Sequence, residues 1–417
     1  MFVSQLRLVN FRSYCDASAV FGPGLNVVVG ANAIGKTNLL EGAWFALRGA
    51  SPRTRREEKL VLWGARFCRV ELTLEDDCAP PAFVELGYAP REGKRMRWNG
   101  VEVGSLDELR DRTQVSIFVP ESLLLVKGSP ARRRTHLDTF ASILDKRYAA
   151  AVREMREALR QRNAQLAAVK GGAPEGSLDA WDAQFARAAV ELGRRRRDVV
   201  GELGGRFAAA AAALAPEGEA YGLQLVSQLE TLGFELDALA EELRRRRPGE
   251  IRRGLSLFGP HRDDVRFFEV ASRTLQTGGP PAQPVGADGI ACASAEPPPG
   301  GRDLRLFGSQ GEQRLAVLAL LLAEQELTAE RTGATGTLFL DDVMSELDDT
   351  RRRLLVKKLS RAGQAIITTT NREYFAKDEL AGATVVELPL PGSQQAATPD
   401  AASGPAAGPA PPEMGAL

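Results

Sequence analysis

The sequence predicts an α/β protein in which two strand-rich segments flank a helical insertion. Near the N-terminus, alternating apolar residues lead to a Gly-Pro-Gly turn at 22–24, an apolar strand at 25–29, and a glycine loop that opens a helix over 37–47. Between 131 and 250 the apolar residues recur at steps of three, four and seven, which is typical of amphipathic helices. Strand patterns return after residue 300.

The same patterns predict how the chain is divided. Residues 1–130 would form the first lobe of a head domain, 131–250 a helical arm, and 251–390 the second part of the head. Segment 272–302 is rich in Pro, Gly and Ala and nearly uncharged, so we expect a disordered insertion there. The tail, 391–417, has the same character, and neither segment is expected to carry chemistry.

Within the first lobe the apolar alternation predicts short strands and a hairpin at Asn99-Gly100. The strands are expected at 61–62, 69–74, 82–86 and 115–119. The arm would consist of two antiparallel helices joined at the Gly-Gly-Ala-Pro break 171–174, with Ser177 as the N-cap of the second. The arginine runs 194–197 and 244–247 are interpreted as solvated helix faces.

Composition excludes several classes of protein. The 417 residues carry 54 Lys+Arg and 54 Asp+Glu, so the net charge is zero and an indiscriminate polycation is excluded; any nucleic-acid contact must come from local basic patches. The four cysteines are far apart, which predicts neither a zinc site nor a disulfide framework. Because neither a signal peptide nor a long apolar run is found, we expect a cytoplasmic protein with no membrane partner.

The strongest motif is a complete G-x-x-x-x-G-K-T between an apolar strand and a helix. Its residues are Gly30, Ala31, Asn32, Ala33, Ile34, Gly35, Lys36 and Thr37. Backbone N–H groups of such a loop and the helix N-terminus face phosphates. The motif therefore predicts a bound nucleotide, with Lys36 reaching the β- and γ-phosphates and Thr37 holding Mg²⁺.

A second motif is the apolar strand 337–340, which ends in Asp341 and Asp342. With a P-loop upstream, Asp341 is interpreted as orienting Mg²⁺ through water and Asp342 as polarising the attacking water. The predicted catalytic residues are therefore Asp342, Asp341 and Lys36, and the predicted metal ligands are Thr37 and Asp341.

A third motif, S-x-G-x-Q, opens an apolar helix about 30 residues before the Asp pair. Its residues Ser309, Gly311 and Gln313 would form a second anion site at a helix N-terminus. One chain has one γ-phosphate, so a second γ-phosphate site suggests two chains that sandwich two nucleotides. Further on, the strand 365–367 ends in the threonines 368–370, one of which would present a hydroxyl to the γ-phosphate.

The order of P-loop, long insertion, S-x-G-x-Q, Asp pair and S-E-L-D (345–348) resembles the ABC-type ATPases of the SMC/Rad50 class. Within that class the chain resembles the RecF family of bacterial recombination and repair proteins. Further matching stretches are 10–14, 38–41, 118–121, 126–130, 132–134, 137–138, 259–264 and 340–348.

The resemblance implies an ABC-type head with two lobes and a short inserted helical arm. It also implies an ATP-dependent homodimer, a weak DNA-stimulated ATPase that acts as a switch, and sequence-independent binding to gapped or double-stranded DNA. Partners would be RecR and RecO, which help to load recombinase during repair of replication gaps, with a place in DNA replication, DNA damage and the SOS response. By carry-over, Ser309, Gly311 and Gln313 would touch the partner's nucleotide and Asp348 would line the dimer seam.

Some positions depart from the family pattern or extend it. Ala33 stands where RecF-type loops usually have Gly, and would be strained if that position needs a positive φ. Gln114 lies too early on its strand to be the Q-loop glutamine, since Phe118 and Glu121 occupy that region. The carboxylate after the Mg²⁺ ligand is Asp342 instead of Glu, which fits a slow, switch-like ATPase.

The best local candidates for DNA contact are Arg53, Arg55 and Arg56, together with the run 132–134. Contacts of this kind would bind phosphates and depend steeply on salt.

Three other classes remain as alternatives. A transport ATPase would need a coupling surface in the insert and usually a Glu after the strand. An SMC- or Rad50-like tether would need a much longer arm and, in Rad50, a C-x-x-C hook. A P-loop kinase would turn over without DNA and without dimerising.

Overall fold

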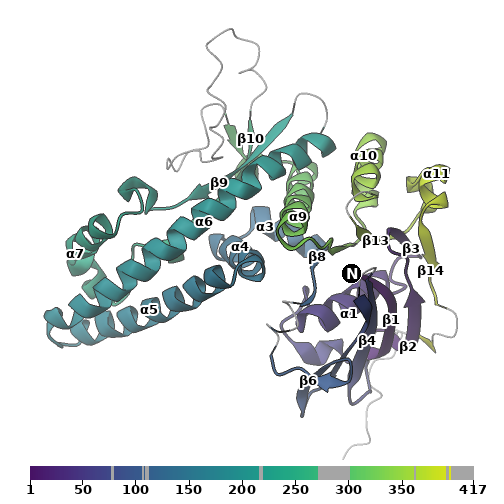
Figure 1. Ribbon diagram of the computed structural model, residues 1–417, viewed down its shortest axis with the longest axis horizontal. Coiled ribbons are helices and arrows are strands. Elements are labelled where there is room, and N and C mark those ends of the chain that lie inside the picture. The colour runs from purple at the N-terminus through teal and green to yellow at the C-terminus, as the bar shows by residue number, and fades with distance from the viewer. Residues whose placement is uncertain are drawn as a thin grey trace, which may run out of the picture.

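In the computed structural model, residues 1–76, 79–105, 108, 112–215, 219–270, 301–360 and 363–390 are described, together with the backbone of 394–395. The described residues form two sheets that build a head, and a helical arm with a third sheet (Figure 1). None of the described helices is long and apolar enough to cross a membrane.

The larger sheet is antiparallel, with seven strands in the order β15-β2-β1-β4-β5-β6-β7. The strands are β1 (Phe2–Phe11), β2 (Tyr14–Val20), β4 (Cys68–Asp76), β5 (Ala79–Ala89), β6 (Gly93–Trp98), β7 (Val101–Glu102) and β15 (Gln394–Gln395). Burial alternates along β4, as expected for a sheet with one face in the core. Asn99 and Gly100 both have positive φ, which confirms the predicted two-residue hairpin turn.

The second sheet is parallel, with five strands in the order β14-β3-β13-β12-β8. The strands are β3 (Leu25–Val29), β8 (Val115–Phe118), β12 (Thr337–Leu340), β13 (Gln364–Thr369) and β14 (Thr384–Glu387). Both faces are covered: Val27 packs into a core with the long helices, whereas Val28 packs into the core shared with the antiparallel sheet. Because all five strands run parallel, their carboxyl ends meet at one edge of the sheet.

The helices of the head follow strands of this parallel sheet, except that α8 and α9 lie between β11 and β12. They are α1 (Lys36–Arg48), α9 (Gln310–Thr332), α10 (Asp349–Leu359) and α11 (Lys377–Ala381), with the one-turn helices α3 (Leu124–Lys127) and α8 (Leu304–Phe307). Short 3-10 turns cover Glu57–Leu60, Pro120–Leu123, Glu175–Leu178, Glu230–Leu232, Pro260–Arg262, Met344–Glu346 and Arg372–Tyr374.

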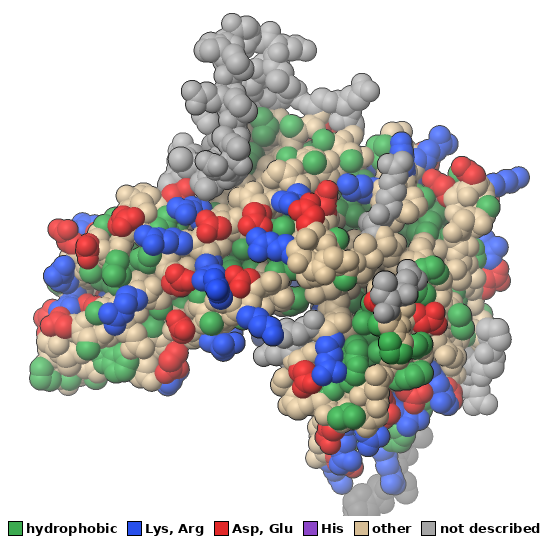
Figure 2. Space-filling model, in the orientation of Figure 1, with side chains coloured by type: hydrophobic (Ala, Val, Ile, Leu, Met, Phe, Trp, Pro, Cys, Tyr) green, Lys and Arg blue, Asp and Glu red, His purple; other side chains and the backbone are tan. Residues whose placement is uncertain are grey.

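The arm contains α4 (Pro130–Leu144), α5 (Lys146–Lys170), α6 (Asp179–Leu214) and α7 (Leu236–Arg253). In Figure 1, α5, α6 and α7 extend to the left, away from the two sheets of the head. The 36 residues of α6 span about 54 Å. Its base packs on α9, so the arm is continuous with the core of the head. Figure 2 shows positive and negative side chains interspersed along the arm.

Several expectations about the arm need correction. The segment 131–250 is not entirely helical, because β9 (Ala220–Val226) lies within it and pairs with β10 (Asp264–Val270), which also pairs with β11 (Gly301–Asp303). Ser177 does not cap α6; it lies in a 3-10 turn, where its hydroxyl donates to the Pro174 carbonyl.

The two segments expected to be disordered fall mostly outside the described residues, as do Cys78 and Cys292. At their edges the expectation is wrong, because Gly301 and Arg302 belong to β11 and Gln394–Gln395 pair with β2.

Candidate nucleotide-binding site

The glycine loop joins the carboxyl end of β3 to the first turn of α1. Gly35 has φ 110°, and a Cβ there would lie 2.7 Å from the Tyr14 hydroxyl, so only glycine fits. Tyr14 in turn donates to the Gly35 carbonyl at 3.1 Å. Ala33 has φ 62°, a left-handed conformation that costs a residue with a Cβ about 1–2 kcal/mol. Ala33, which stands where the family usually has glycine, therefore has a backbone conformation that favours glycine.

The Lys36 side chain lies over this loop and is only 7% exposed. Its ammonium donates to the carbonyls of Gly30 (2.7 Å) and Ala31 (2.8 Å). Burial lowers the pKa of Lys36, and the carboxylates of Asp342 and Asp341 act against that shift. The ammonium is thus held at the loop that the sequence predicts to bind phosphate.

Asp341 brings the P-loop and the end of β12 together. It accepts hydrogen bonds from Thr37 Oγ1 at 2.8 and 3.0 Å, and from Thr368 Oγ1 at 2.8 Å. Burial raises the pKa of Asp341, whereas the hydroxyls of Thr368 and Thr37 lower it. Thr368 is one of the three threonines of which one was expected to present a hydroxyl to a γ-phosphate, and it bonds to this carboxylate.

The oxygen atoms around Asp341 fit a hard divalent cation. A hydroxyl and a carboxylate in contact are the protein ligands that Mg²⁺ takes when phosphates and water complete its shell. Among the described residues no group of three or more His, Cys, Asp or Glu side chains could hold a metal alone. A Mg²⁺ ion held by Thr37 and Asp341 would take phosphate oxygens and water as its remaining ligands.

Asp342 adopts a left-handed conformation, with φ 48°. Its N–H donates to Thr368 Oγ1 at 3.0 Å, and its Oδ2 accepts from Ser345 Oγ at 3.0 Å. Its Oδ1 is buried and has no hydrogen-bond partner in the described part of the chain. One carboxylate oxygen is thus oriented by Ser345 while the other is left as an acceptor.

The S-x-G-x-Q motif forms the N-terminus of α9 through a capping box. The Ser309 hydroxyl accepts from the Glu312 N–H, and Glu312 Oε2 accepts from the Ser309 N–H at 2.6 Å. Ser309 is exposed and Gly311 half-buried, whereas Gln313 is 3% exposed and donates to the Leu304 carbonyl. In this conformation the Gln313 side chain is turned into the fold, and its contact with a partner's nucleotide stays a prediction.

The S-E-L-D segment lies between β12 and α10. Asp348 is the N-cap of α10, where its side chain accepts from the Arg351 N–H at 2.9 Å, and it is exposed. Glu346 lies 2.5 Å from the Arg314 guanidinium, which also packs over the Phe118 ring. The segment therefore links the end of β12 to α9.

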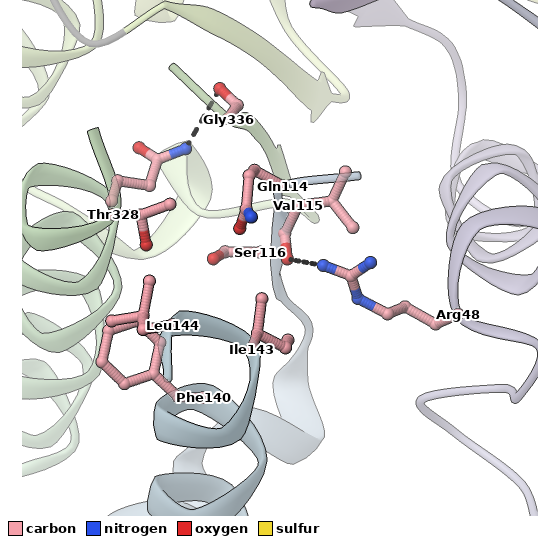
Figure 3. Close-up of a pocket in the computed structure, with 10 residues that line it drawn as sticks. Arg48, Gln114, Val115, Ser116, Phe140, Ile143, Leu144, Thr328 and Gly336 are labelled. Atoms are coloured by element: carbon pink, nitrogen blue, oxygen red, sulfur yellow. Dashed lines mark hydrogen bonds between the residues drawn. The ribbon is translucent and has the colours of Figure 1, made fainter. Parts of the chain in front are cut away.

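Gln114 precedes β8, at the end of the parallel sheet opposite to the P-loop. Figure 3 shows Gln114 at a small pocket with Phe140, Ile143 and Thr328, while Arg48 donates to the Val115 carbonyl at 3.0 Å. Gln114 thus lies at the start of its strand, away from the P-loop, as its early place in the sequence predicts. The carboxyl end of β8 instead leads to Glu121, 3.9 Å from Arg53.

The predicted DNA-contacting arginines have different environments. Arg53 donates to Glu41 at 3.1 Å and to Asn38 at 3.3 Å, so its guanidinium lies against α1. Arg55 and Arg56 are exposed. Arg133 is buried in a bidentate pair with Asp264 and is not available to DNA.

A buried contact that sequence reasoning missed lies beside the P-loop helix. Glu41, fully buried in α1, accepts from Arg12 at 2.6 and 2.9 Å as well as from Arg53 and Ser51. An acidic residue on the inner face of a helix is the one signal that could have revealed it.

The G-P-H-R-D-D segment anchors the arm. Arg196 on α6 is 4% exposed and pairs with Asp138 and Asp263, both at 2.9 Å. The expectation of a solvated face for the run 194–197 is therefore wrong for Arg196. Asp264, through Arg133, ties α4 to β10 in the same way.

The chain is similar in sequence to known proteins over most of its length. A family model described as the RecF/RecN/SMC N terminal domain matches residues 2–387. The DNA replication and repair protein RecF of Heliobacterium modesticaldum is 32% identical over 393 residues, covering 93% of this chain and 97% of that protein. The RecF protein of Moorella thermoacetica is 35% identical over 369 residues, covering 88% and 90%.

Solved structures agree with these sequence matches. A structure of the recombination mediator protein RecF with ATPrS, in the RecFOR pathway, superposes with a TM-score of 0.72 at 26% identity, covering 90% of this chain and 94% of the other. An Smc head bound to the C-winged helix domain of ScpA superposes with a TM-score of 0.52 at 16% identity, covering 93% and 94%, and shares the fold alone.

Proposed function

Because the chain belongs to the RecF family of DNA replication and repair proteins, within the wider RecF/RecN/SMC family, we propose that it is an ATP-controlled DNA-repair switch. ATP binding assembles two chains on gapped or double-stranded DNA, and the dimer helps RecR and RecO to load recombinase at replication gaps. The observation that carries the proposal is the contact between Thr37 and Asp341, which joins the P-loop to the end of β12.

In this proposal the P-loop holds the phosphates of ATP. The loop amides and the N-terminus of α1 bind the phosphate oxygens, and Lys36 exchanges the carbonyls of Gly30 and Ala31 for the β- and γ-phosphates. Thr37 and Asp341 would hold Mg²⁺, which when bound neutralises phosphate charge. Asp342, with its free Oδ1 and its Oδ2 held by Ser345, orients the attacking water.

The second half of each nucleotide site would come from the partner chain. Ser309 and Gly311 stand at the N-terminus of α9, a helix of 23 residues whose dipole favours an anion. Asp348 would lie along the seam between the two chains. Arg53, Arg55 and Arg56 would contact DNA phosphates, which predicts affinity that falls steeply with salt and has little sequence preference.

Binding, and not turnover, would be the working signal, so the ATPase is slow and stimulated by DNA. Such a protein acts in the cytoplasm, in DNA replication, DNA damage repair and the SOS response.

The oligomeric state tests the proposal directly. Multi-angle light scattering of the full chain is measured without nucleotide, with ADP, with ATP, and with ATP plus a gapped duplex. Lys36→Met runs alongside, with Lys170→Met, an exposed lysine at the end of α5, as the matched control. We expect a dimer with ATP only, favoured by DNA, absent in Lys36→Met and retained in Lys170→Met.

The opposite result has an equally clear meaning. If the protein is a monomer in all four conditions and hydrolyses ATP without DNA, the N-terminus of α9 is an ordinary helix cap. The protein would then be a P-loop enzyme of another class.

A further inference from the structure

Trp63 is the most exposed large apolar side chain among the described residues, at 94%. The other three tryptophans are half-buried. Trp63 stands at the corner of a turn in which the Ala65 N–H donates to the Leu62 carbonyl at 2.9 Å and Gly64 has φ 85°. This is the geometry of a type II turn, with glycine at the position that needs a positive φ.

The backbone under this indole is fixed. The Leu62 N–H donates to the Asn10 carbonyl at 2.8 Å, and Leu62 is 8% exposed. Cys68, where β4 begins, is fully buried. A large aromatic ring held in solvent by an ordered backbone leaves its burial free energy unrealised, which is typical of a binding surface.

The stretch of chain that carries Trp63 is cationic. Arg55, Arg56, Lys59 and Arg66 are exposed and make no ion pair with any described residue. Of the two carboxylates in the same stretch, Glu57 is paired with Lys94 at 2.6 Å, which leaves Glu58. Phe67, at 46% exposure, adds a second aromatic ring. We call residues 55–67 the aromatic–basic loop.

We propose that the aromatic–basic loop binds an unpaired nucleotide, with its base stacked on Trp63 and its phosphates held by the surrounding cations. The excess of unpaired positive charge selects a polyanion, and an exposed indole offers a face to any base. In a duplex the base faces are already stacked on one another, so the loop would read the single-stranded part of a gapped substrate. This inference rests on the proposed function, and it adds a way in which the protein would distinguish a gap from continuous duplex.

The loop is also bonded to the P-loop helix. Arg12 donates to the loop twice, from its backbone N–H to the Leu60 carbonyl at 2.7 Å and from Nη1 to the Lys59 carbonyl at 3.0 Å. The same guanidinium binds Glu41 of α1. Asn10 and Arg12 both have positive φ, which marks a constrained backbone between the loop and the helix. A nucleotide on Trp63 would thus lie a few contacts from the ATP site.

Fluorescence anisotropy tests the inference on the full chain with ATP. Labelled oligo-dT, a gapped duplex and a continuous duplex of equal length are titrated with wild type, Trp63→Ala and Trp63→Phe. Phe83→Ala, which removes an aromatic ring 58% exposed on β5, is the matched control. We expect Trp63→Ala to bind oligo-dT and the gapped duplex about tenfold more weakly, with the continuous duplex unchanged. Trp63→Phe should retain most of the affinity, and Phe83→Ala should match wild type.

A second readout is the intrinsic tryptophan fluorescence. Unlabelled oligo-dT should quench part of the wild-type emission, and that part should be missing in Trp63→Phe.

The outcomes separate this inference from the proposed function. If wild type binds gapped DNA in an ATP-dependent way but Trp63→Ala binds all three substrates equally well, the loop is not a nucleotide site, and its exposed rings belong to a protein contact. If Trp63→Ala loses affinity for all three substrates alike, the selection of unpaired bases is wrong. If wild type binds none of them, the proposed function fails first and the inference with it.

Discussion

The Thr37 hydroxyl donates to both carboxylate oxygens of Asp341, at 2.8 and 3.0 Å, although 304 residues separate the two side chains in sequence. The contact exists because β3 and β12 lie on either side of β13 in one parallel sheet and end at the same edge. The whole arm is inserted between these two strands. The chain therefore leaves this sheet at β8, forms the arm, and returns to the sheet at β12, beside whose end Asp341 lies.

Removing this hydroxyl while keeping the side-chain shape should separate its two roles. We expect Thr37→Val to lower the free energy of unfolding by about 1–3 kcal/mol, because the buried Asp341 loses a donor. It should also abolish the increase in ATP affinity that Mg²⁺ gives. Urea denaturation and calorimetric titration with ATP, with Mg²⁺ or with EDTA, measure both effects. Thr37→Ser should behave like wild type, and an unchanged Mg²⁺ dependence in Thr37→Val would remove Thr37 from the metal site.

The backbone at Ala33 predicts a substitution that does not lower the free energy of unfolding, in contrast to Thr37→Val. With φ 62°, Ala33 has a conformation that glycine adopts without strain. Glycine also loses more chain entropy on folding, about 0.5–1 kcal/mol, which offsets part of the gain. We expect Ala33→Gly to be neutral to about 1 kcal/mol more stable in urea denaturation.

Ala31→Gly is the matched control in the same loop, because Ala31 has no positive φ. It should be less stable than wild type, since only the entropy cost applies there. Equal destabilisation by both substitutions would show that the Ala33 backbone is not strained.

Features that depend on neighbouring residues could be predicted from the sequence, whereas features that depend on distant residues could not. The P-loop, strand 25–29 and the hairpin at Asn99-Gly100 are confirmed, because glycine turns and a short continuous apolar run are local properties of the sequence. In contrast, β9 was missed, since its pairing with β10 depends on residues about forty positions away. Local periodicity alone extended the helical pattern through it.

Buried polar residues were the least predictable part of the site. Nothing near Arg196 distinguishes it from its neighbours in the run 194–197; its partner Asp138 lies 58 residues away on another helix. Gln313 and one of the threonines 368–370 were assigned to a nucleotide for the same reason. In the structure Gln313 Nε2 donates to the Leu304 carbonyl while its Oε1 is buried without a partner among the described residues, and Thr368 donates to Asp341.

Asp342→Asn should separate ATP binding from hydrolysis. Asparagine tolerates a left-handed backbone as well as aspartate does, so φ 48° is preserved, and its amide oxygen can accept from Ser345. The negative charge that would polarise a water is lost. We expect ATP-dependent dimers by light scattering with phosphate release reduced at least about a hundredfold, the order of a lost general base. Loss of the dimer would contradict the view that binding is the signal.

The buried pairs that hold α6 to the G-P-H-R-D-D segment should dominate the stability of the arm. Arg196→Met removes the guanidinium and leaves Asp138 and Asp263 without their shared cation, a change that costs about 3–5 kcal/mol in comparable buried pairs. Arg195→Met is the control, because its pairs with Glu191 and Asp145 are partly exposed and contribute about 1 kcal/mol or less. Urea denaturation followed by circular dichroism compares them, and similar losses in both variants would argue against an anchoring role.

The chain has two histidines, and they should affect stability with opposite dependence on pH. Burial lowers the pKa of His261 to about 4, below the ordinary value near 6.5. As the pH falls below about 6.5, His261 becomes protonated in the unfolded chain but stays neutral in the folded protein. The free energy of unfolding therefore falls by up to about 1.4 kcal/mol per pH unit. His261→Gln keeps a donor for the Ser256 carbonyl, 3.1 Å from Nε2, and should flatten this loss.

His136 should behave in the reverse way. Burial acts to lower its pKa, but the Glu324 carboxylate, 2.7 Å from Nε2, outweighs burial and raises the pKa above 6.5. The stabilisation is therefore complete below pH 6.5 and is lost as the pH rises through the folded value. His136→Gln should be destabilised more at pH 5.5 than at pH 8, whereas His261→Gln should gain relative to wild type as the pH is lowered over the same interval. Urea denaturation at four pH values measures how the free energy of unfolding of each variant changes with pH. Every other titrating group is shared by the two variants. If both variants show the same dependence on pH, at least one of the two histidine environments is assigned wrongly.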